Sequence, residues 1–219
     1  MLTYEEIIKD EEIKEYISKG NEYLGLLGYT DHSEVHTKTV AKRAEYILKE
    51  LGYDDKTIEL TMIASYMHDI GNVINRKTHA EYGALLANEL LKERDLTNSE
   101  RVQVISAISH HDETTGGAVD PISAALIIAD KTDVRRNRVR EKIMSAFDIH
   151  DRVNYAVTST KLEVDSVNKK ITLYMDVDEE ICTMFEYFEI FLGRMMMCRE
   201  SSKLLGCEFS LVSNGSKIL

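Results

Sequence analysis

Hydrophobic residues recur with helical spacing through about the first 159 residues, and a single proline occurs in the whole chain. The clearest stripe runs over residues 33–51 and is followed by Gly52, a residue that often ends helices. Residues 56–70 are apolar on most sides, which is typical of a helix in the middle of a bundle. Further helices are predicted over 79–91, from about 97 to 110, and from Pro121 towards Ala146.

Two of these helices carry recognisable start signals. Thr97 and Glu100 form a capping box, in which each side chain can bond a free backbone N–H of the first turn. Asp120 stands where an N-cap is expected, and Pro121 follows at the first helical position, where its missing N–H costs nothing. The first part of the chain is therefore predicted to be a bundle of at least five helices.

The periodicity changes after about residue 160. Hydrophobic and polar residues alternate around 162–164 and over 171–177, which predicts a β-hairpin. Helical spacing returns over 181–195, and 208–214 is expected to form a last short strand. We therefore expect a mainly α protein, with a helical domain over residues 1–159 and a small ββαβ appendage over 160–219 packed on it.

Charge and cysteine content exclude several classes of protein. The 38 acidic and 27 basic residues give a net charge of -11, which disfavours bulk nucleic acid as a partner. The three cysteines have no C-x-x-C spacing, so neither a disulfide framework nor a zinc ribbon is indicated. The N-terminus lacks a signal-peptide pattern, and the longest apolar run, 124–129, is too short to span a bilayer. A cytoplasmic protein without a membrane partner is expected.

Several histidines and two acids fall on apolar helix stripes. His36 lies four residues before Val40, so its imidazole should face the core. His68-Asp69 ends the most apolar helix, where an unpaired buried carboxylate would cost several kcal/mol. Asp130 follows the apolar run AALIIA. A lone buried histidine usually has a structural hydrogen bond, but this set together indicates a metal site, which the negative end of a helix also favours.

Three more histidines extend the set. His79 shares a helix face with Gly83, whose missing side chain lets another backbone approach closely. His110-His111 ends the capped helix, and Ile108 leads towards this end. Nitrogen and oxygen donors of this kind suit Mn, Fe, Co, Ni or Zn, and a carboxylate can bridge two ions about 3.5 to 4 Å apart. Asp69 is the natural bridging residue.

The order of these motifs resembles the HD-domain superfamily of metal-dependent phosphohydrolases. The core motif is His68-Asp69-Ile70-Gly71, and the resemblance covers about residues 30–140. It implies an HD-domain helical bundle. The flanking matches are H-T-K-T-V-A-K-R-A at His36, T-H-A-E-Y-G-A at His79, I-S-H-H-D at His110 and His111, and I-A-D-K at Asp130.

The resemblance also implies ligands and a reaction. The cofactor would be one or two divalent transition metal ions, and a metal-activated hydroxide would attack the phosphorus of a small phosphate ester, such as a nucleotide. Asp69 would be catalytic as the bridging carboxylate, and no protein nucleophile would be needed. A first ion would be bound by His36, His68, Asp69 and Asp130, and a second by Asp69, His79, His110 and His111.

Two departures from the family limit the choice of substrate. Asn72 stands where phosphodiesterase branches often have lysine, so Arg76 or Lys77 would have to supply the charge. The Gly-Tyr-Pro motif of the cyclic-di-GMP branch is missing, and that substrate is not assigned. Lys131, directly after Asp130, is the best candidate for a catalytic phosphate contact, although a structural role is equally open.

Other polar residues receive less specific interpretations. His32 is one turn before His36 and is expected at the site edge, whereas His150-Asp151 is expected to be structural or exposed. The basic run of Arg138, Arg140 and Lys142 is expected to be a solvated helix face.

Two alternatives to hydrolysis stay open. The same ligands could hold mixed-valent di-iron in an oxygenase, or the protein could be a metal-stabilised regulatory module without catalysis. Met195–Met197 and the phenylalanines before them indicate a core stripe or a homodimer contact.

Overall fold

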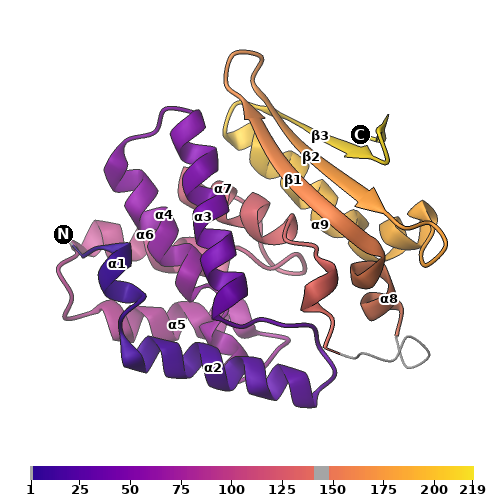
Figure 1. The fold of residues 1–219 in the computed structure, drawn as a ribbon. Helices are drawn as coiled ribbons and strands as arrows, with labels where there is room; N and C mark the ends of the chain where they lie inside the picture. The colour runs from indigo at the N-terminus through magenta and orange to yellow at the C-terminus, as the bar shows by residue number, and fades with distance from the viewer. Residues whose placement is uncertain (1, 141–147) are drawn as a thin grey trace.

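The computed structural model describes residues 2–140 and 148–219 and confirms a mainly α fold (Figure 1). The predicted helices around residues 33–51, 56–70, 79–91 and 97–110 all form. The helical part consists of α1 (Tyr4–Ile7), α2 (Glu11–Leu26), α3 (Glu34–Glu50), α4 (Asp55–Met67), the 3-10 helix η1 (Ile70–Val73), α5 (His79–Leu91), α6 (Asn98–Ser109), α7 (Pro121–Lys131), the 3-10 helix η2 (Arg136–Arg138) and α8 (Ile149–Ala156).

Helix α4 is the centre of the bundle, as its apolar sequence predicts. It packs against α3, α6 and α7, and its residues from Leu60 to Met67 are all buried. A helix surrounded on all sides needs apolar residues on every face, which explains why no polar stripe runs along it. Because α4 is fixed in this way, the polar pair that follows it, His68-Asp69, is held deep inside the protein.

The C-terminal part forms a sheet covered by one long helix (Figure 1). Strand β1 pairs antiparallel with β2, and β2 pairs parallel with β3, so the connection between β2 and β3 has to cross over the sheet. Helix α9 makes this crossover and packs against both β3 and α7. The elements are β1 (Val157–Asp165), β2 (Lys170–Val177), α9 (Met184–Leu204), β3 (Glu208–Ser213) and β4 (Ser216–Lys217).

The predicted ββαβ order is confirmed, with β4 as a short addition that pairs with β3. A continuous cluster of buried hydrophobic residues extends from Leu2 in the helical part to Leu211 in the sheet. The division of the chain at residue 160 stays a prediction. Within residues 2–140 and 148–219, every helix is too short or too polar to cross a bilayer.

The prediction of one long helix from Pro121 towards Ala146 is wrong. Helix α7 ends at Lys131, and the chain then turns through Asp133 into η2; Ala146 lies outside the described residues. The turn has a physical cause, because the carboxylate of Asp133 is buried and hydrogen-bonded to the imidazole of His36 on α3. This bond across the bundle holds the chain in a position that a continuing helix would not give it.

Both predicted start signals are present. Asp120 accepts a hydrogen bond from the backbone of Ser123, with Pro121 at the first position of α7. Thr97 and Glu100 form the reciprocal capping box of α6. Lys56 also pairs with the Glu100 carboxylate, at 2.5 Å.

Replacing Glu100 with glutamine should remove a pH-dependent part of the stability. Bonds from Lys56 and Thr97 lower the pKa of Glu100 to about 2. A lowered pKa stabilises the folded state above the ordinary value of 4.5, and this contribution is lost as the pH falls from there towards 2. We expect Glu100→Gln to cost about 0.5 to 1 kcal/mol at pH 7 and less at pH 3. Urea unfolding at both pH values measures this, and an equal cost at both would contradict it.

Candidate metal centre

The ends of five helices meet at one buried point, and each end contributes a predicted ligand. His36 lies in the first turn of α3, and His68 and Asp69 lie between α4 and η1. His79 begins α5, and Asp130 lies in the last turn of α7. His111 follows the end of α6. Helix ends are separated in sequence but adjacent in space here, so the bundle itself assembles the ligands.

One group of donors is formed by His36, His68 and Asp130, whose ligand atoms lie within 4.8 Å of one another. His36 Nε2 lies 3.2 Å from Asp130 Oδ1 and 3.7 Å from Asp69 Oδ2. Two donors that each lie about 2.1 Å from a metal ion are separated by roughly 3.0 to 3.4 Å. The buried Nε2 atoms of His36 and His68 have no hydrogen-bond partner, so this group fits a metal ion.

A second group adjoins the first and is formed by His68, Asp69 and His111. His79 joins it, because its Nε2 lies 3.1 Å from His111 Nε2 and 3.6 Å from Asp69 Oδ1. Asp69 thus faces different imidazoles with its two oxygens, since its Oδ2 lies 3.2 Å from His68 Nε2. Groups of this composition can hold metal ions.

The other nitrogen of each imidazole is used to orient the ring. The Nδ1 atoms of His68, His79 and His111 lie 2.7, 2.9 and 2.6 Å from the carbonyl oxygens of Ser65, Arg76 and Ile108. A carbonyl can only accept, so these Nδ1 atoms carry the hydrogen and each Nε2 presents its lone pair to the centre. His36 is oriented instead by a carboxylate, with Nδ1 2.8 Å from Asp133 Oδ2.

Burial sets the charge states that metal binding requires. It lowers the pKa of His111, helped by the nearby His68 and His79, and it lowers the pKa of His79 together with Arg76. Both imidazoles are therefore neutral at neutral pH, which is the form that can bind a metal ion. Burial alone would raise the pKa of Asp69, but its electrostatic interaction with His68, whose Nε2 lies 3.2 Å from Asp69 Oδ2, outweighs burial and holds this pKa well below its ordinary value.

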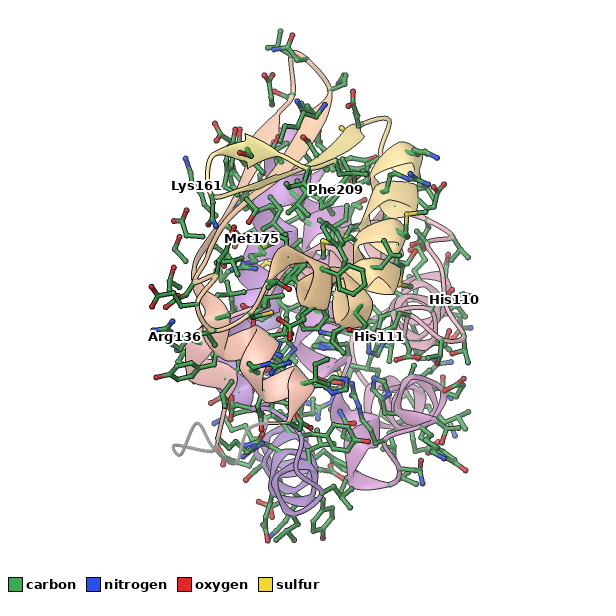
Figure 2. All side chains as sticks on the ribbon, turned by 90° about the vertical axis from the view of Figure 1, so that its right-hand side faces the viewer. His110, His111, Arg136, Lys161, Met175 and Phe209 are labelled. Carbon is green, nitrogen blue, oxygen red and sulfur yellow. The ribbon has the colours of Figure 1, made fainter. Side chains whose placement is uncertain are left out.

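The structure does not bring His110 to this centre. His110 is half-buried and His111 is buried, and His110 lies nearer the edge of the molecule in the view of Figure 2. The Nδ1 of His110 lies 2.8 Å from the carbonyl oxygen of Ser106 on its own helix. The assignment of His110 as a ligand stays a prediction.

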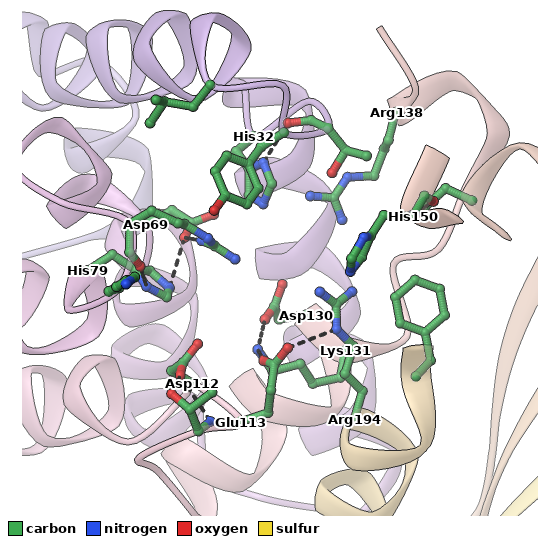
Figure 3. A pocket seen from close by; sticks show the side chains of 18 of the residues that line it. His32, Asp69, His79, Asp112, Glu113, Asp130, Lys131, Arg138, His150 and Arg194 are labelled. Carbon is green, nitrogen blue, oxygen red and sulfur yellow. Dashed lines mark hydrogen bonds and ion pairs between the residues drawn. The ribbon is translucent and has the colours of Figure 1, made fainter. Parts of the chain in front are cut away.

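The centre opens into a pocket of about 710 Å³ (Figure 3). Lys131 also lines this pocket, but it is buried and paired, with Nζ 2.9 Å from Asp130 Oδ2 and 2.6 Å from Glu113 Oε2. Its role as a phosphate contact stays a prediction. Burial alone would lower the pKa of Lys131, but the negative charges of Asp130 and Glu113 outweigh burial and raise this pKa above its ordinary value. The amine is therefore charged. Glu113 also accepts a hydrogen bond from Arg194 Nε at 3.0 Å.

Two residues that follow Asp69 in the chain, Asn72 and Arg76, lie close to its Oδ1 atom. Asn72 donates to Asp69 Oδ1 at 2.8 Å, and Arg76 donates to Asn72 Oδ1 at 3.2 Å. The Arg76 guanidinium lies 3.8 Å from Asp69 Oδ1, and Lys77 also lines the pocket. Arg76 and Lys77 therefore both line the pocket, and the substitution of either for the missing lysine stays a prediction.

The interpretation of Arg138 as part of a solvated helix face is wrong. Arg138 is buried and donates to the backbone oxygens of Asp31 and Asp133, each at 2.9 Å, because the chain has left α7 and packs against the loop before α3. Arg140 is exposed but also bonds this loop, at the carbonyl oxygen of Tyr29. Lys142 lies outside the described residues.

Two further histidines lie on the pocket wall. His32 does so as predicted, with Nδ1 2.7 Å from the carbonyl oxygen of Thr30. His150 is exposed as predicted, yet it faces the same pocket from α8 (Figure 3).

The sequence did not single out Asp133, Glu113 or Arg194. Asp133 follows Asp130 at a spacing of three, which in a helix would place both acids on one face, and this signal could have indicated it. No comparable signal marks Glu113 or Arg194, since Glu113 lies in the loop between α6 and α7 and meets Arg194 of α9 across 81 residues of sequence.

Comparison with known proteins agrees with the geometry. The model of the HD domain matches residues 34–153, which is more than half of the chain. The chain belongs to the HD-domain family. This family consists generally of metal-dependent phosphohydrolases, and the matched range contains every ligand of the two groups.

Two relatives show how far this HD-domain protein resembles known chains. An uncharacterized protein of Methanocaldococcus jannaschii, MJ1020, is 30% identical over 173 residues, which cover 68% of this chain and 66% of the relative. A ribonuclease Y from a Sulfurovum species is 31% identical over 123 residues, 54% of this chain and 22% of the relative. The chain thus spans slightly less than two thirds of the first relative and less than a quarter of the second.

Gly71 of the HD motif allows the backbones at the centre to approach closely. A Cβ atom at Gly71 would lie 2.0 Å from the His79 carbonyl oxygen and 2.5 Å from the Gly83 nitrogen. Gly71→Ala should therefore lower the free energy of unfolding by about 3 kcal/mol or more, because neither backbone can move without shifting His79.

Gly193 provides the matched control for Gly71. It lies within α9, and a Cβ there would meet nothing within 4 Å, so Gly193→Ala should stabilise by about 0.5 to 1 kcal/mol. Urea unfolding of both variants measures the difference. Equal stability of the two variants would show that the close approach at Gly71 is not required.

Proposed function

We propose that the protein is a metal-dependent phosphohydrolase that cleaves a small phosphate ester, with a nucleotide as the preferred class. The buried Nε2 atoms of His36 and His68 carry this proposal. They have no protein partner, they face the carboxylates of Asp69 and Asp130, and the site opens into a pocket of about 710 Å³. Buried unpaired acceptors beside ionised carboxylates are stabilised best by a cation.

We further propose two ions with Asp69 between them. Its Oδ2 faces His68 while its Oδ1 faces His79, which supports a bridging role. Divalent ions bound there would supply the lowered water pKa and the charge neutralisation that phosphate ester hydrolysis needs. Donor types alone leave the metal open among Mn, Fe, Co, Ni and Zn.

The chain's own residues would bind and orient the substrate. Arg76 and Lys131 offer positive charge on two sides of the centre. Tyr29 lines the pocket with 43% of its surface exposed, and the Arg76 guanidinium lies 5.7 Å from its ring centroid. An exposed aromatic ring next to a phosphate-binding charge can stack a nucleobase, which favours a nucleotide.

Elemental analysis and an activity panel test the proposal. The purified protein is loaded with each candidate metal, its ion content is measured, and hydrolysis is followed for phosphomonoesters, phosphodiesters, nucleotides and a short single-stranded RNA. We expect about two ions per chain and turnover of a small nucleotide. A folded protein with two ions that is inactive on the whole panel would contradict the proposal, and a mixed-valent iron signal in electron paramagnetic resonance that responds to added substrate would favour an oxygenase.

A further inference from the structure

Helix α9 supplies part of the pocket wall although it lies outside the matched HD domain, which ends at residue 153. Arg194 and Phe191 of this helix both line the pocket. Figure 3 shows Arg194, Lys131 and Arg138 on one side of the pocket, with Asp69 and His79 on the other. The C-terminal part of the chain therefore contributes a cation to the pocket that opens from the metal centre.

Arg194 is held in place by two contacts. Its Nε donates to Glu113 Oε1 at 3.0 Å, and its guanidinium carbon lies 4.6 Å from the ring centroid of the buried Phe191. These contacts fix the plane of the guanidinium group but use only one of its nitrogens. Within residues 2–140 and 148–219 the two Nη nitrogens have no hydrogen-bond partner, so they can bind a ligand in the pocket, in the planar arrangement that suits a phosphate group.

On the side of the pocket that carries Arg194, Lys131 and Arg138, the positive charges outnumber the carboxylates that pair with them. Glu113 is shared between Lys131 and Arg194, while Asp130 belongs to the ligand group of the metal centre. Asp133 is shared among three guanidinium groups and His36, which leaves an excess of positive charge at Arg138. Asp148 and Asp151 also line the pocket, Asp148 as the N-cap of α8 and Asp151 in its first turn, where the helix dipole stabilises negative charge.

We infer that Arg194, together with Arg138, binds a second phosphate of the substrate beside the one at the metal centre. This inference rests on the proposed function and names its substrate class, compounds with two or more phosphoryl groups such as nucleoside diphosphates. The helix that covers the sheet would then determine specificity, while the HD domain carries the ligands of the metal ions. Arg194 acts here as a specificity-determining residue.

Binding of two non-hydrolysable ligands tests the inference. Phosphonate analogues of AMP and ADP are titrated calorimetrically into the metal-loaded protein, its Arg194→Gln and Arg194→Lys variants, and Arg199→Gln. Arg199 is also on α9 but pairs with Glu200 away from the pocket, which makes it a matched control. We expect the ADP analogue to bind about tenfold or more tightly than the AMP analogue, and Arg194→Gln to remove most of this preference.

The remaining variants and the kinetics give separate outcomes. Arg194→Lys should keep part of the preference because it keeps the charge, and Arg199→Gln should keep all of it. In activity assays, Arg194→Gln should lower kcat/KM for ADP about tenfold more than for AMP, through KM. A preference that survives in Arg194→Gln, or that is missing from the unaltered protein, would overturn the inference. A protein that hydrolyses neither nucleotide but loses the binding preference in Arg194→Gln would contradict the proposed hydrolysis and support the second phosphate site.

Discussion

Asp69→Asn is expected to lower kcat/KM for the phosphate ester substrate by about a thousandfold or more. The two oxygens of Asp69 face separate imidazoles, with Oδ2 3.2 Å from His68 Nε2 and Oδ1 3.6 Å from His79 Nε2. Asparagine has nearly the same size but carries one oxygen and no charge, so it cannot bridge two ions. The ion content per chain should fall in the same variant. Steady-state kinetics and elemental analysis of one preparation measure both effects.

The control for this variant is Asp55→Asn, which removes a carboxylate at the exposed start of α4, the helix that leads to Asp69. It should keep both activity and ion content. Full activity of Asp69→Asn would show that its carboxylate takes no part in the reaction. A loss of stability without any loss of activity would instead support a metal-stabilised regulatory module.

The inner part of the site was predictable because it follows helical periodicity. The spacing of four between His36 and Val40 places the imidazole on the buried face of α3, and the structure shows His36 fully buried. The run of apolar residues before Asp130 likewise predicts a carboxylate held inside the bundle, and Asp130 joins the first ligand group. Motifs at the ends of regular helices can be found from sequence because the local pattern fixes which way the side chain points.

The outer part of the site was less predictable because it depends on where the chain leaves regular structure. Residues 132–140 have a polar, basic sequence that also suits an exposed helix, and nothing in it shows that α7 ends at Lys131. The structure ends the helix there because Asp133 bonds His36 from a distant helix. The burial of Arg138 follows from this turn. Arg194 meets Glu113 across 81 residues of sequence, and local patterns do not contain such contacts.

Asp133 links the inner and the outer part of the site, because it orients the imidazole of His36 and also neutralises arginines near the pocket. Its Oδ2 lies 2.8 Å from His36 Nδ1, and its Oδ1 lies 2.7 Å from Arg135 Nε. Burial raises the pKa of Asp133, but the hydrogen bond with His36 and the charges of Arg138 and Arg43 outweigh it and keep the pKa below its ordinary value. The carboxylate is therefore ionised, and from outside the candidate metal site it orients the imidazole of His36, as it would have to if His36 binds a metal ion.

Asp133→Ala is expected to lower the free energy of unfolding of the metal-free protein by about 3 to 5 kcal/mol. The side chain of Asp133 is fully buried, and its loss would leave several arginines close together without their shared counter-charge. The same variant should bind metal about 10- to 100-fold more weakly, because His36 would lose the partner that fixes its ring. Urea unfolding without metal and competition with a chelator measure the two effects separately.

Asp133→Asn separates charge from shape in this prediction. It keeps the volume and one acceptor oxygen, so His36 can remain oriented while the arginines lose their counter-charge. We therefore expect most of the stability loss but a smaller loss of metal affinity than in Asp133→Ala, with Asp55→Ala as the exposed control. If Asp133→Ala unfolded at the same urea concentration as the unaltered protein and held metal equally well, Asp133 could not be the residue that orients His36. The orientation would then come from the bundle alone, since the backbone of α3 would be sufficient to aim the imidazole at Asp130.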